Sequence, residues 1–340
     1  MTWSQLDWNI LDRLRAGFIG GTAAQGPYWQ SEEDLAHYDL TYAERIGWKW
    51  DAVLREVRQR GWAPRGGLLM DWGCGSGVAS RRVLKAFGAE RFDSLVVWDH
   101  SALATDYVSQ RAAKDWPALD CATATPGFLE AGSPIGLLVI SHVLNELDEA
   151  GIAALRRLIL RSESVLWVEP GTKDVGRGLQ AVRDTLLPEF RTVAPCTHDK
   201  PCPLLAAGRE NDWCHFFAAP PGEIFANSDW VKFGQRAGID LRSLPYCFLL
   251  LERRPAAEGT GQAHDGTLSR VIGRPEFFKP YARLLNCDAS GAAELTLQKR
   301  DDKALLKALE KAKGPLVYHW EREDNFIRTG QRFGEAPAEA

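Results

Sequence analysis

Four cysteines are the residues of this sequence whose type and spacing point most clearly to chemistry: Cys196, Cys202, Cys214 and Cys247. The first three lie within nineteen residues, in the segments A-P-C-T-H-D-K-P-C-P-L-L and N-D-W-C-H-F-F. We expect a soluble chain in a compartment that keeps thiols reduced, where clustered cysteines hold a metal or react more often than they form disulfides. The cluster therefore predicts a cofactor.

The spacing of these cysteines favours iron over zinc. Five, eleven and 32 residues separate successive members, so the tight pairs typical of structural zinc are absent. Four thiolates without tight pairs suit a four-iron–four-sulfur cluster, and the Cys202-Pro203 dipeptide is typical of ferredoxins. His198 and His215 could also serve as ligands, so zinc stays open as the alternative metal. The C-x3-C-x2-C pattern of radical enzymes is absent.

The remaining cysteines have simpler interpretations. Cys247 is the weakest member of the predicted set, because a cysteine in a strand is commonly a core residue. Cys121 and Cys287 are interpreted as bystanders, and Cys74 as a packing residue. Pro-Cys dipeptides also form the nucleophile of cytosine-5 RNA methyltransferases. That nucleophile belongs just after the fourth strand, where this chain has another segment, so we reject this role.

A glycine-rich turn, D-W-G-C-G-S-G at 71–77, predicts a second cofactor. It connects a buried strand expected at 66–73 to a helix, and glycine lets the backbone turn sharply and approach a ligand. The acid that ends the next strand is placed to accept hydrogen bonds from a ribose. The G-x-G-x-G spacing differs from that of dinucleotide enzymes and resembles the first motif of S-adenosylmethionine-dependent methyltransferases. The predicted cofactor-binding residues are Asp71, Gly73, Gly75, Gly77, Asp99 and Ser141.

The segment S-H-V-L-N-E-L at 141–147 lies where methyltransferases place residues that face the methyl-transfer centre. His142 is a candidate general base, and Asn145 or Glu146 could orient a substrate. The alternative is that His142 and Asn145 only satisfy backbone groups of the loop. The sequence leaves both interpretations open.

The elements that must position these residues form a parallel α/β sheet. Apolar runs predict strands at 66–73, 94–99, 135–141, 164–170 and 246–254, and amphipathic helices separate the first four. This alternation indicates a doubly wound, Rossmann-like fold. We expect a helical segment at 1–60, a methyltransferase-like domain at 61–254 with a cysteine-rich insertion at 190–228, and a small β-rich domain at 264–325 after a Gly-rich linker at 255–266.

Composition limits the classes of partner. The net charge is −4, so no global basic field indicates nucleic acid, and any RNA contact must be local. The absence of a long apolar run predicts no membrane span, and the amphipathic start predicts neither a secretory nor a transit peptide. We therefore expect a cytoplasmic monomer.

Taken together, these segments resemble the methyltransferase-like assembly factors of the mitochondrial small ribosomal subunit and their bacterial relatives. The shared pieces span about 60 to 320 and are D-W-G-C-G-S-G, S-H-V-L-N-E-L, V-E-P-G-T, A-P-C-T-H-D-K-P-C-P-L, D-W-C-H-F, S-R-V-I-G-R-P and Y-A-R-L-L-N-C. The resemblance implies a methyltransferase fold that binds S-adenosylmethionine, an iron–sulfur cluster on Cys196, Cys202, Cys214 and Cys247, and binding to small-subunit ribosomal RNA. Two features depart from the family: Glu169-Pro170-Gly171 replaces a frequent Arg-Gly, and the charge is mildly acidic.

Three functions remain open. The chain is an assembly factor with weak or no methyl transfer, an active methyltransferase acting on ribosomal RNA, or a methyltransferase for a small molecule or protein with a structural zinc site. Only the last predicts no RNA affinity. The candidate RNA-binding residues lie near and within the predicted small domain and are Arg253, Arg254, Arg270, Arg274, Lys279, Arg283, Lys299 and Arg300.

Overall fold

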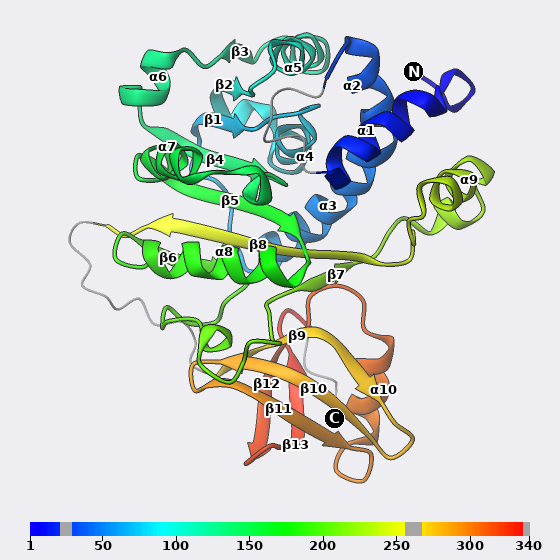
Figure 1. Ribbon diagram of the computed structural model, residues 1–340. Helices are drawn as coiled ribbons and strands as arrows, with labels where there is room; N and C mark the ends of the chain where they lie inside the picture. Colours follow the sequence, from blue (N-terminus) through cyan, green and yellow to red (C-terminus); the bar gives the residue numbers. More distant parts are fainter. Residues whose placement is uncertain (21–28, 256–266, 336–340) are drawn as a thin grey trace. The chain divides into compact units, whose positions relative to one another are not determined.

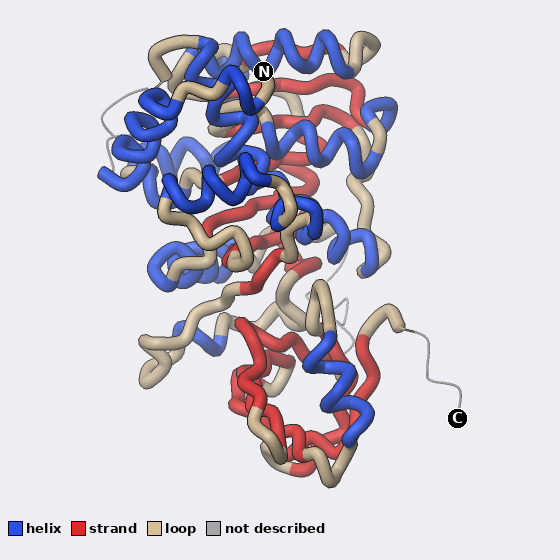
Figure 2. The backbone as a smooth tube through the Cα atoms, turned by 90° about the vertical axis from the view of Figure 1, so that its right-hand side faces the viewer, coloured by secondary structure: helices blue, strands red, loops and turns tan. Residues whose placement is uncertain are grey.

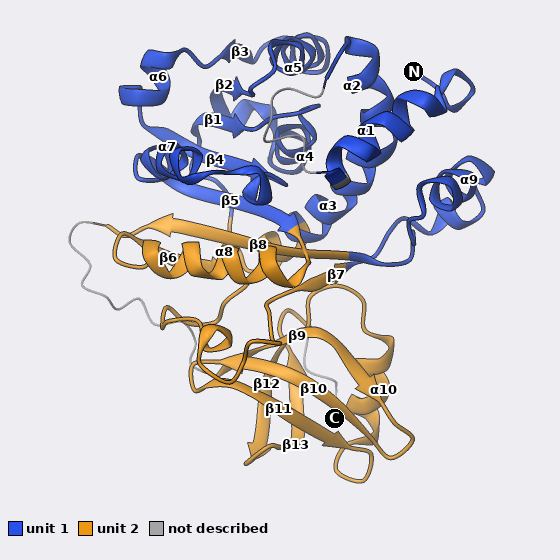
Figure 3. Cartoon of the chain, in the orientation of Figure 1, with its two compact units in different colours: residues 1–54, 63–169, 218–244 blue, residues 55–62, 170–217, 245–340 orange. Residues whose placement is uncertain are grey.

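The structure, a computed structural model, describes residues 1–20, 29–255 and 267–335. Most of the linker predicted at 255–266 lies outside these residues. The described chain divides into two compact units, coloured separately in Figure 3. Unit 1 comprises 1–54, 63–169 and 218–244, and unit 2 comprises 55–62, 170–217 and 245–340. Each is described by itself below.

Unit 1 holds most of the parallel sheet (Figure 1). Its strands are β1 (Gly67–Trp72), β2 (Phe92–Trp98), β3 (Asp120–Thr123), β4 (Ile135–Ser141) and β5 (Ser162–Pro170), in the order β3-β2-β1-β4-β5 with every pair parallel. The carboxyl ends of β1, β2 and β4 therefore meet at one edge. This order confirms the predicted Rossmann-like fold.

Helices connect these strands and precede them. The helices of unit 1 are α1 (Trp8–Gly20), α2 (Glu32–Tyr38), the start of α3 (Glu44–Gln59), α4 (Val78–Phe87), α5 (Ala102–Asp115), α6 (Pro126–Ala131), α7 (Glu149–Ile159) and α9 (Ser228–Ala237). Helix α4 packs on β1 and β4, and α5 packs on β2 and β3. Helix α4 ends at Gly88, whose φ of 88° lies in the left-handed region that favours glycine.

Unit 2 contains the cysteine-bearing loops and a small β-domain. Helix α8 (Lys173–Leu186) precedes β6 (Phe190–Ala194), which pairs antiparallel with β8 (Leu244–Arg253), and β7 (Phe216–Ala218) also pairs with β8. The predicted strand at 246–254 is therefore present as β8. Within the described residues, no helix of either unit is long and apolar enough to cross a membrane.

The predicted β-rich domain is a closed five-stranded barrel, seen as a ring of strands in Figure 2. Its strands are β9 (Leu268–Phe277), β10 (Tyr281–Asp288), β11 (Gly291–Gln298), β12 (Val317–Glu323) and β13 (Phe326–Arg332), with α10 (Lys303–Lys311) between the third and fourth. Ten buried side chains, including Leu284, Leu295 and Ile327, form its core. The barrel strands span 268–332, so they start within the range predicted for this domain, 264–325, and end seven residues after it.

Candidate functional site

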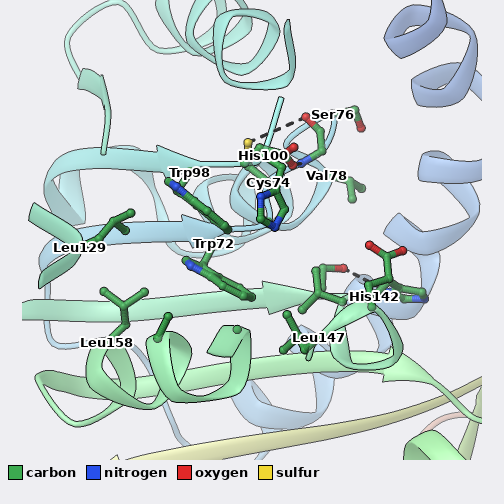
Figure 4. Close-up of a pocket in the computed structure, with 18 of the residues that line it drawn as sticks. Trp72, Cys74, Ser76, Val78, Trp98, His100, Leu129, His142, Leu147 and Leu158 are labelled. Atoms are coloured by element: carbon green, nitrogen blue, oxygen red, sulfur yellow. Dashed lines mark hydrogen bonds between the residues drawn. The ribbon is translucent and has the colours of Figure 1, made fainter. Parts of the chain in front are cut away.

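A cavity of about 690 Å³ opens in unit 1 at the carboxyl ends of β1, β2 and β4 (Figure 4). Four predicted cofactor-binding residues line it: Gly73, Gly75, Asp99 and Ser141. A cavity at this edge of a parallel sheet is the usual ligand site of the fold. The structure therefore brings most of the predicted set together.

The glycine turn is shaped by the strand beside it. The amides of Gly73 and Cys74 donate to the Trp98 carbonyl over 2.8 and 3.0 Å, so the turn folds back over the end of β2. Gly75 has a φ of +50°, and a Cβ built there would meet no atom within 4 Å. The backbone at Gly75 consequently borders open cavity space, as close approach to a ligand requires.

Two predicted residues support the turn from behind instead of lining the cavity. Asp71 is fully buried, and its Oδ2 accepts from the Ser80 hydroxyl over 2.6 Å and the Ser80 amide over 3.2 Å. Burial raises its pKa to about 7. A Cβ on Gly77 would lie 2.9 Å from the Val108 side chain of α5, so glycine there allows the turn to pack closely against that helix.

Asp99 is held by the turn. Its Oδ2 accepts from the Gly75 amide over 2.9 Å and its Oδ1 from the Ser101 amide over 3.0 Å. Burial raises the pKa of this carboxyl, and the backbone donors oppose that shift. The carboxylate is thus fixed at the cavity wall, where its remaining lone pairs can accept from a ribose.

Aromatic rings form another wall of the cavity. Trp72 and Trp98, at the ends of β1 and β2, stack with centroids 4.9 Å apart and planes at 15°. His100 packs edge-on against Trp98, with 4.8 Å between centroids. Figure 4 shows these three rings together beside the glycine turn. Flat apolar surface next to a carboxylate that can accept hydrogen bonds suits a purine base.

Some residues of the segment that follows β4 line the cavity, and others lie at the protein surface. His142 and Glu146 line the cavity, whereas Asn145 is exposed and outside its lining. His142 has a φ of 57°, which only few non-glycine residues adopt. The Glu169 Oε1 accepts from the amides of Val143 and Leu144 over 3.0 and 3.1 Å and fixes this turn.

His142 is paired with a residue that the sequence analysis missed. Its Nε2 lies 3.1 Å from the Lys49 Nζ. Burial lowers the pKa of His142 well below its usual range, and Lys49 and Arg45 lower it further. A neutral imidazole whose Nε2 accepts from an ammonium is a weak base. The general-base role stays a prediction, and the alternating W-K-W of α3 is the only local signal for Lys49.

A second, smaller cavity lies in unit 2 among the cysteines. Cys196, Cys202, Cys214 and Cys287 line it, together with His198 and Arg270. Burial raises the pKa of the Cys214 thiol well above its usual range, and its three cysteine neighbours raise it further. Cys247 lies elsewhere: it is fully buried in β8, and its Sγ donates to the Pro170 carbonyl over 3.3 Å.

The structure therefore brings together three of the four predicted metal ligands and adds Cys287 in the place of Cys247. The bystander interpretation of Cys287 misses this, although Cys287 ends the family-like segment Y-A-R-L-L-N-C. His198 Nε2 lies 3.6 Å from the Cys287 Sγ, whereas His215 stacks on Trp213 outside this cavity. In the described part of the chain, no three His, Cys, Asp or Glu side chains are close enough to hold a single metal ion.

Three arginines hold the loops that carry the cysteines. Arg60 donates to the carbonyls of Val193, Pro195 and Cys196, and Arg183 to those of His198 and Lys200. Arg177 donates to carbonyls of the following loop, those of Leu204, Arg209 and Asp212. These guanidiniums donate to backbone carbonyls of β6 and of the loops that follow it, and so hold these segments in place.

The RNA-binding role predicted for Arg270 is wrong. Arg270 is 3% exposed, forms an ion pair with Glu56 and lies 3.9 Å from the centroid of the Phe216 ring. It is a buried structural residue, because the start of β9 packs inward. Arg254 donates a hydrogen bond to the Asp199 carboxylate over 2.9 Å. The predicted residues that are exposed are Arg274, Lys279, Lys299 and Arg300.

The fold and the cavity together define a methyltransferase-like protein of the Rossmann-like class. The sequence matches the profile of the family described as mitochondrial small ribosomal subunit Rsm22 over residues 43–314, which is most of the chain. The chain belongs to this family, as the resemblance implies. Among curated proteins, none matches the sequence.

Solved structures that resemble this chain include methyltransferases. They include the N-methyltransferase NodS from Bradyrhizobium japonicum with S-adenosylhomocysteine (13% identity, 64% of this chain and 91% of that one, TM-score 0.39). Another is the magnesium protoporphyrin IX methyltransferase from Synechocystis with bound S-adenosylmethionine (14%, 73% and 98%, 0.38). A third is an rRNA methylase from Streptococcus thermophilus (11%, 58% and 92%, 0.33).

Proposed function

We propose that this protein binds S-adenosylmethionine in the unit 1 cavity and acts on the RNA of the small ribosomal subunit. Membership of the Rsm22 family carries the ribosomal part of this proposal. The glycine turn and Asp99, both at the cavity, support the cofactor part. Such a protein works where small subunits are assembled, which we take to be the cytoplasm, and as a monomer.

The residues of the cavity fit the cofactor chemically. The backbone at Gly73 and Gly75 would lie along the amino-acid portion, and Asp99 would accept from the ribose. When bound, S-adenosylmethionine supplies an activated methyl group for transfer to a nucleophile. His142 and Glu146 border the cavity where such a nucleophile would enter. The Lys49 Nζ lies within hydrogen-bond distance of the His142 Nε2. We therefore expect His142 and Glu146 to orient a substrate more than to remove its proton.

We further propose that a four-iron–four-sulfur cluster is held by Cys196, Cys202, Cys214 and Cys287. All four line one small cavity, and four cysteine thiolates are the usual ligand set of such a cluster. Arg183 and Arg270 lie near enough to act electrostatically on these thiols and would offset the charge of the thiolates. Bound cluster would add to the folding free energy, because only the native chain brings these residues together.

Elemental analysis of protein purified without oxygen tests the cluster. We expect about four iron and four sulfide per chain in the wild type, as in a four-iron cluster. Cys287→Ser should lose most of the iron, and Cys247→Ser, the matched control, should keep it. Iron that is lost from Cys247→Ser and kept in Cys287→Ser would overturn the assignment. Stoichiometric zinc without sulfide would favour the alternative, a methyltransferase with a structural zinc site that includes His198.

A further inference from the structure

The barrel of unit 2 has the strand order of an oligonucleotide-binding fold. Its strands close in the order β9-β10-β11-β13-β12, with β11 and β13 parallel and α10 between the third and fourth strands. This is the arrangement of the OB-fold. Such barrels bind oligonucleotides or oligosaccharides on the outer face of the second and third strands, next to the loops between strands one and two and between strands four and five.

Stacked aromatic rings lie at this place in the chain. Phe278, in the turn between β9 and β10, stacks on Tyr281 with centroids 4.7 Å apart and planes at 23°. The guanidinium of Arg283, on β10, is ion-paired with Glu276 over 2.5 Å and lies 5.8 Å from the centre of the Phe278 ring. Phe278 is 44% exposed, although burying such a ring in the protein would be favourable. The stack is therefore a surface that a ligand could extend.

The strand register extends this surface across the barrel. Arg283 on β10 pairs with Thr296 on β11, and Thr296 pairs with Phe326 on β13. The neighbours of all three in sequence, such as Leu284, Leu297 and Ile327, point into the core. Because side chains alternate along a strand, Arg283, Thr296 and Phe326 share the outer face. Phe326 is 41% exposed and directly follows the loop between the fourth and fifth strands.

The charge of the barrel differs from that of the whole chain. Residues 267–335 contain thirteen Lys and Arg against ten Asp and Glu, a net charge of +3, whereas the whole chain carries −4. Lys279, Lys299 and Arg300 are exposed, and the Lys299 amide donates to the Pro280 carbonyl over 2.9 Å. This bond brings the end of β11 beside the aromatic turn. Cations flanking exposed rings are the pattern of single-strand binding surfaces.

We propose that the outer face of the barrel, centred on Phe278, Tyr281 and Arg283, binds single-stranded RNA. Unpaired bases stack on the exposed rings, and Lys279 and the two cations that follow β11 contact phosphates. This deepens the proposed function, on which it rests for the choice of RNA, by assigning a site and a single-stranded substrate. A duplex hides the faces of its bases and cannot use such a platform.

Fluorescence anisotropy with a labelled oligouridylate of about 12 nucleotides tests this site on the full-length protein. Replacing both rings, Phe278→Ala with Tyr281→Ala, should weaken binding at least about tenfold, because stacking on one ring contributes roughly 5- to 150-fold. Phe225→Ala is the matched control, since Phe225 is 49% exposed but belongs to unit 1. An unlabelled RNA duplex should not displace the oligonucleotide. Thermal unfolding of each variant verifies that it folds.

Two results would overturn the inference. One is wild-type affinity in the folded double variant, and the other is displacement by the duplex as strong as by single strands. If the wild type binds purified small ribosomal subunits but not the oligonucleotide, this site is wrong and the proposed function stands. If it binds neither, the proposed function fails as well.

Discussion

At the scale of single residues, Gly75 offers the sharpest test of the cofactor cavity. Gly75→Val should reduce affinity for S-adenosylmethionine at least about tenfold in calorimetry, because its side chain would enter space that the ligand needs. Gly61→Val is the control. Gly61 also has a positive φ and no atom within 4 Å of a built Cβ, but lies outside this cavity. Unchanged affinity in Gly75→Val, or an equal loss in Gly61→Val, would contradict the placement.

The buried carboxyl of Glu169 predicts a dependence of stability on pH. Burial raises its pKa to about 7 from an ordinary value of 4.5. The folded state therefore binds a proton that the unfolded state has released, so this stabilisation is present below about pH 4.5 and is lost as pH rises through 7. Glu169→Gln keeps the acceptor for the amides of Val143 and Leu144 but does not titrate.

Denaturant unfolding at pH 5 and pH 8 measures this contribution. We expect the free energy of unfolding to fall between these values by about 3 kcal/mol more in the wild type than in Glu169→Gln. Glu163→Gln, an exposed change on the same strand, should keep the wild-type difference. An identical pH profile in wild type and Glu169→Gln would show that this carboxyl is charged in the folded protein.

The sequence predicted the residues that line the unit 1 cavity better than it predicted which cysteines lie together. Gly73, Gly75 and Asp99 sit at strand ends, where local pattern is sufficient to place them. Cys247 and Cys287 differ only in which neighbours the fold brings to them, and both lie on strands. The spacing of the cysteines does not predict that β10 lies beside the loop around Cys196, because this contact joins residues about 90 positions apart.

At the scale of elements, Arg183 of α8 connects a helix to the cysteine loops. Its fully buried guanidinium donates to the carbonyls of His198 and Lys200 over 2.7 and 2.9 Å, and to the Thr192 hydroxyl. Arg183→Ala should lower the free energy of unfolding by about 2–4 kcal/mol, because buried carbonyls lose their donors and the ion pair with the partly exposed Asp184 is broken.

The matched control for this change is Arg242→Ala, which removes an exposed ion pair with Asp240. It should leave the unfolding midpoint in denaturant close to that of the wild type. Arg183→Ala should also lose iron, since its loops carry Cys196 and Cys202. A midpoint for Arg183→Ala that matches Arg242→Ala would show that the guanidinium does not organise these loops.

Elements with strong hydrophobic periodicity were predicted, and weak ones were missed. The strands β1, β2, β4, β5 and β8 are buried over most of their length and read as apolar runs. In contrast, β3 has only four residues, Asp120–Thr123, three of them exposed, so no pattern identifies it. The barrel strands alternate inward and outward residues, which indicates β-structure but not the closure of the barrel, because closure depends on long-range pairing.

At the scale of the whole molecule, charge is segregated along the chain. The barrel region carries +3 within a chain of net charge −4, so we expect the proposed RNA binding to be local and sensitive to salt. The net charge of the whole chain does not show this difference, which appears only when the charges of the barrel are counted by themselves.

Sedimentation with purified ribosomal subunits tests the central claim, that this protein acts on the small subunit. The anaerobically purified protein is incubated with small subunits, taken from assembling and mature pools, or with large subunits, at low and high salt. We predict co-sedimentation with small subunits only, falling steeply as salt rises because phosphate contacts release counterions. No association with small subunits, or equal association with both subunits, would contradict the account.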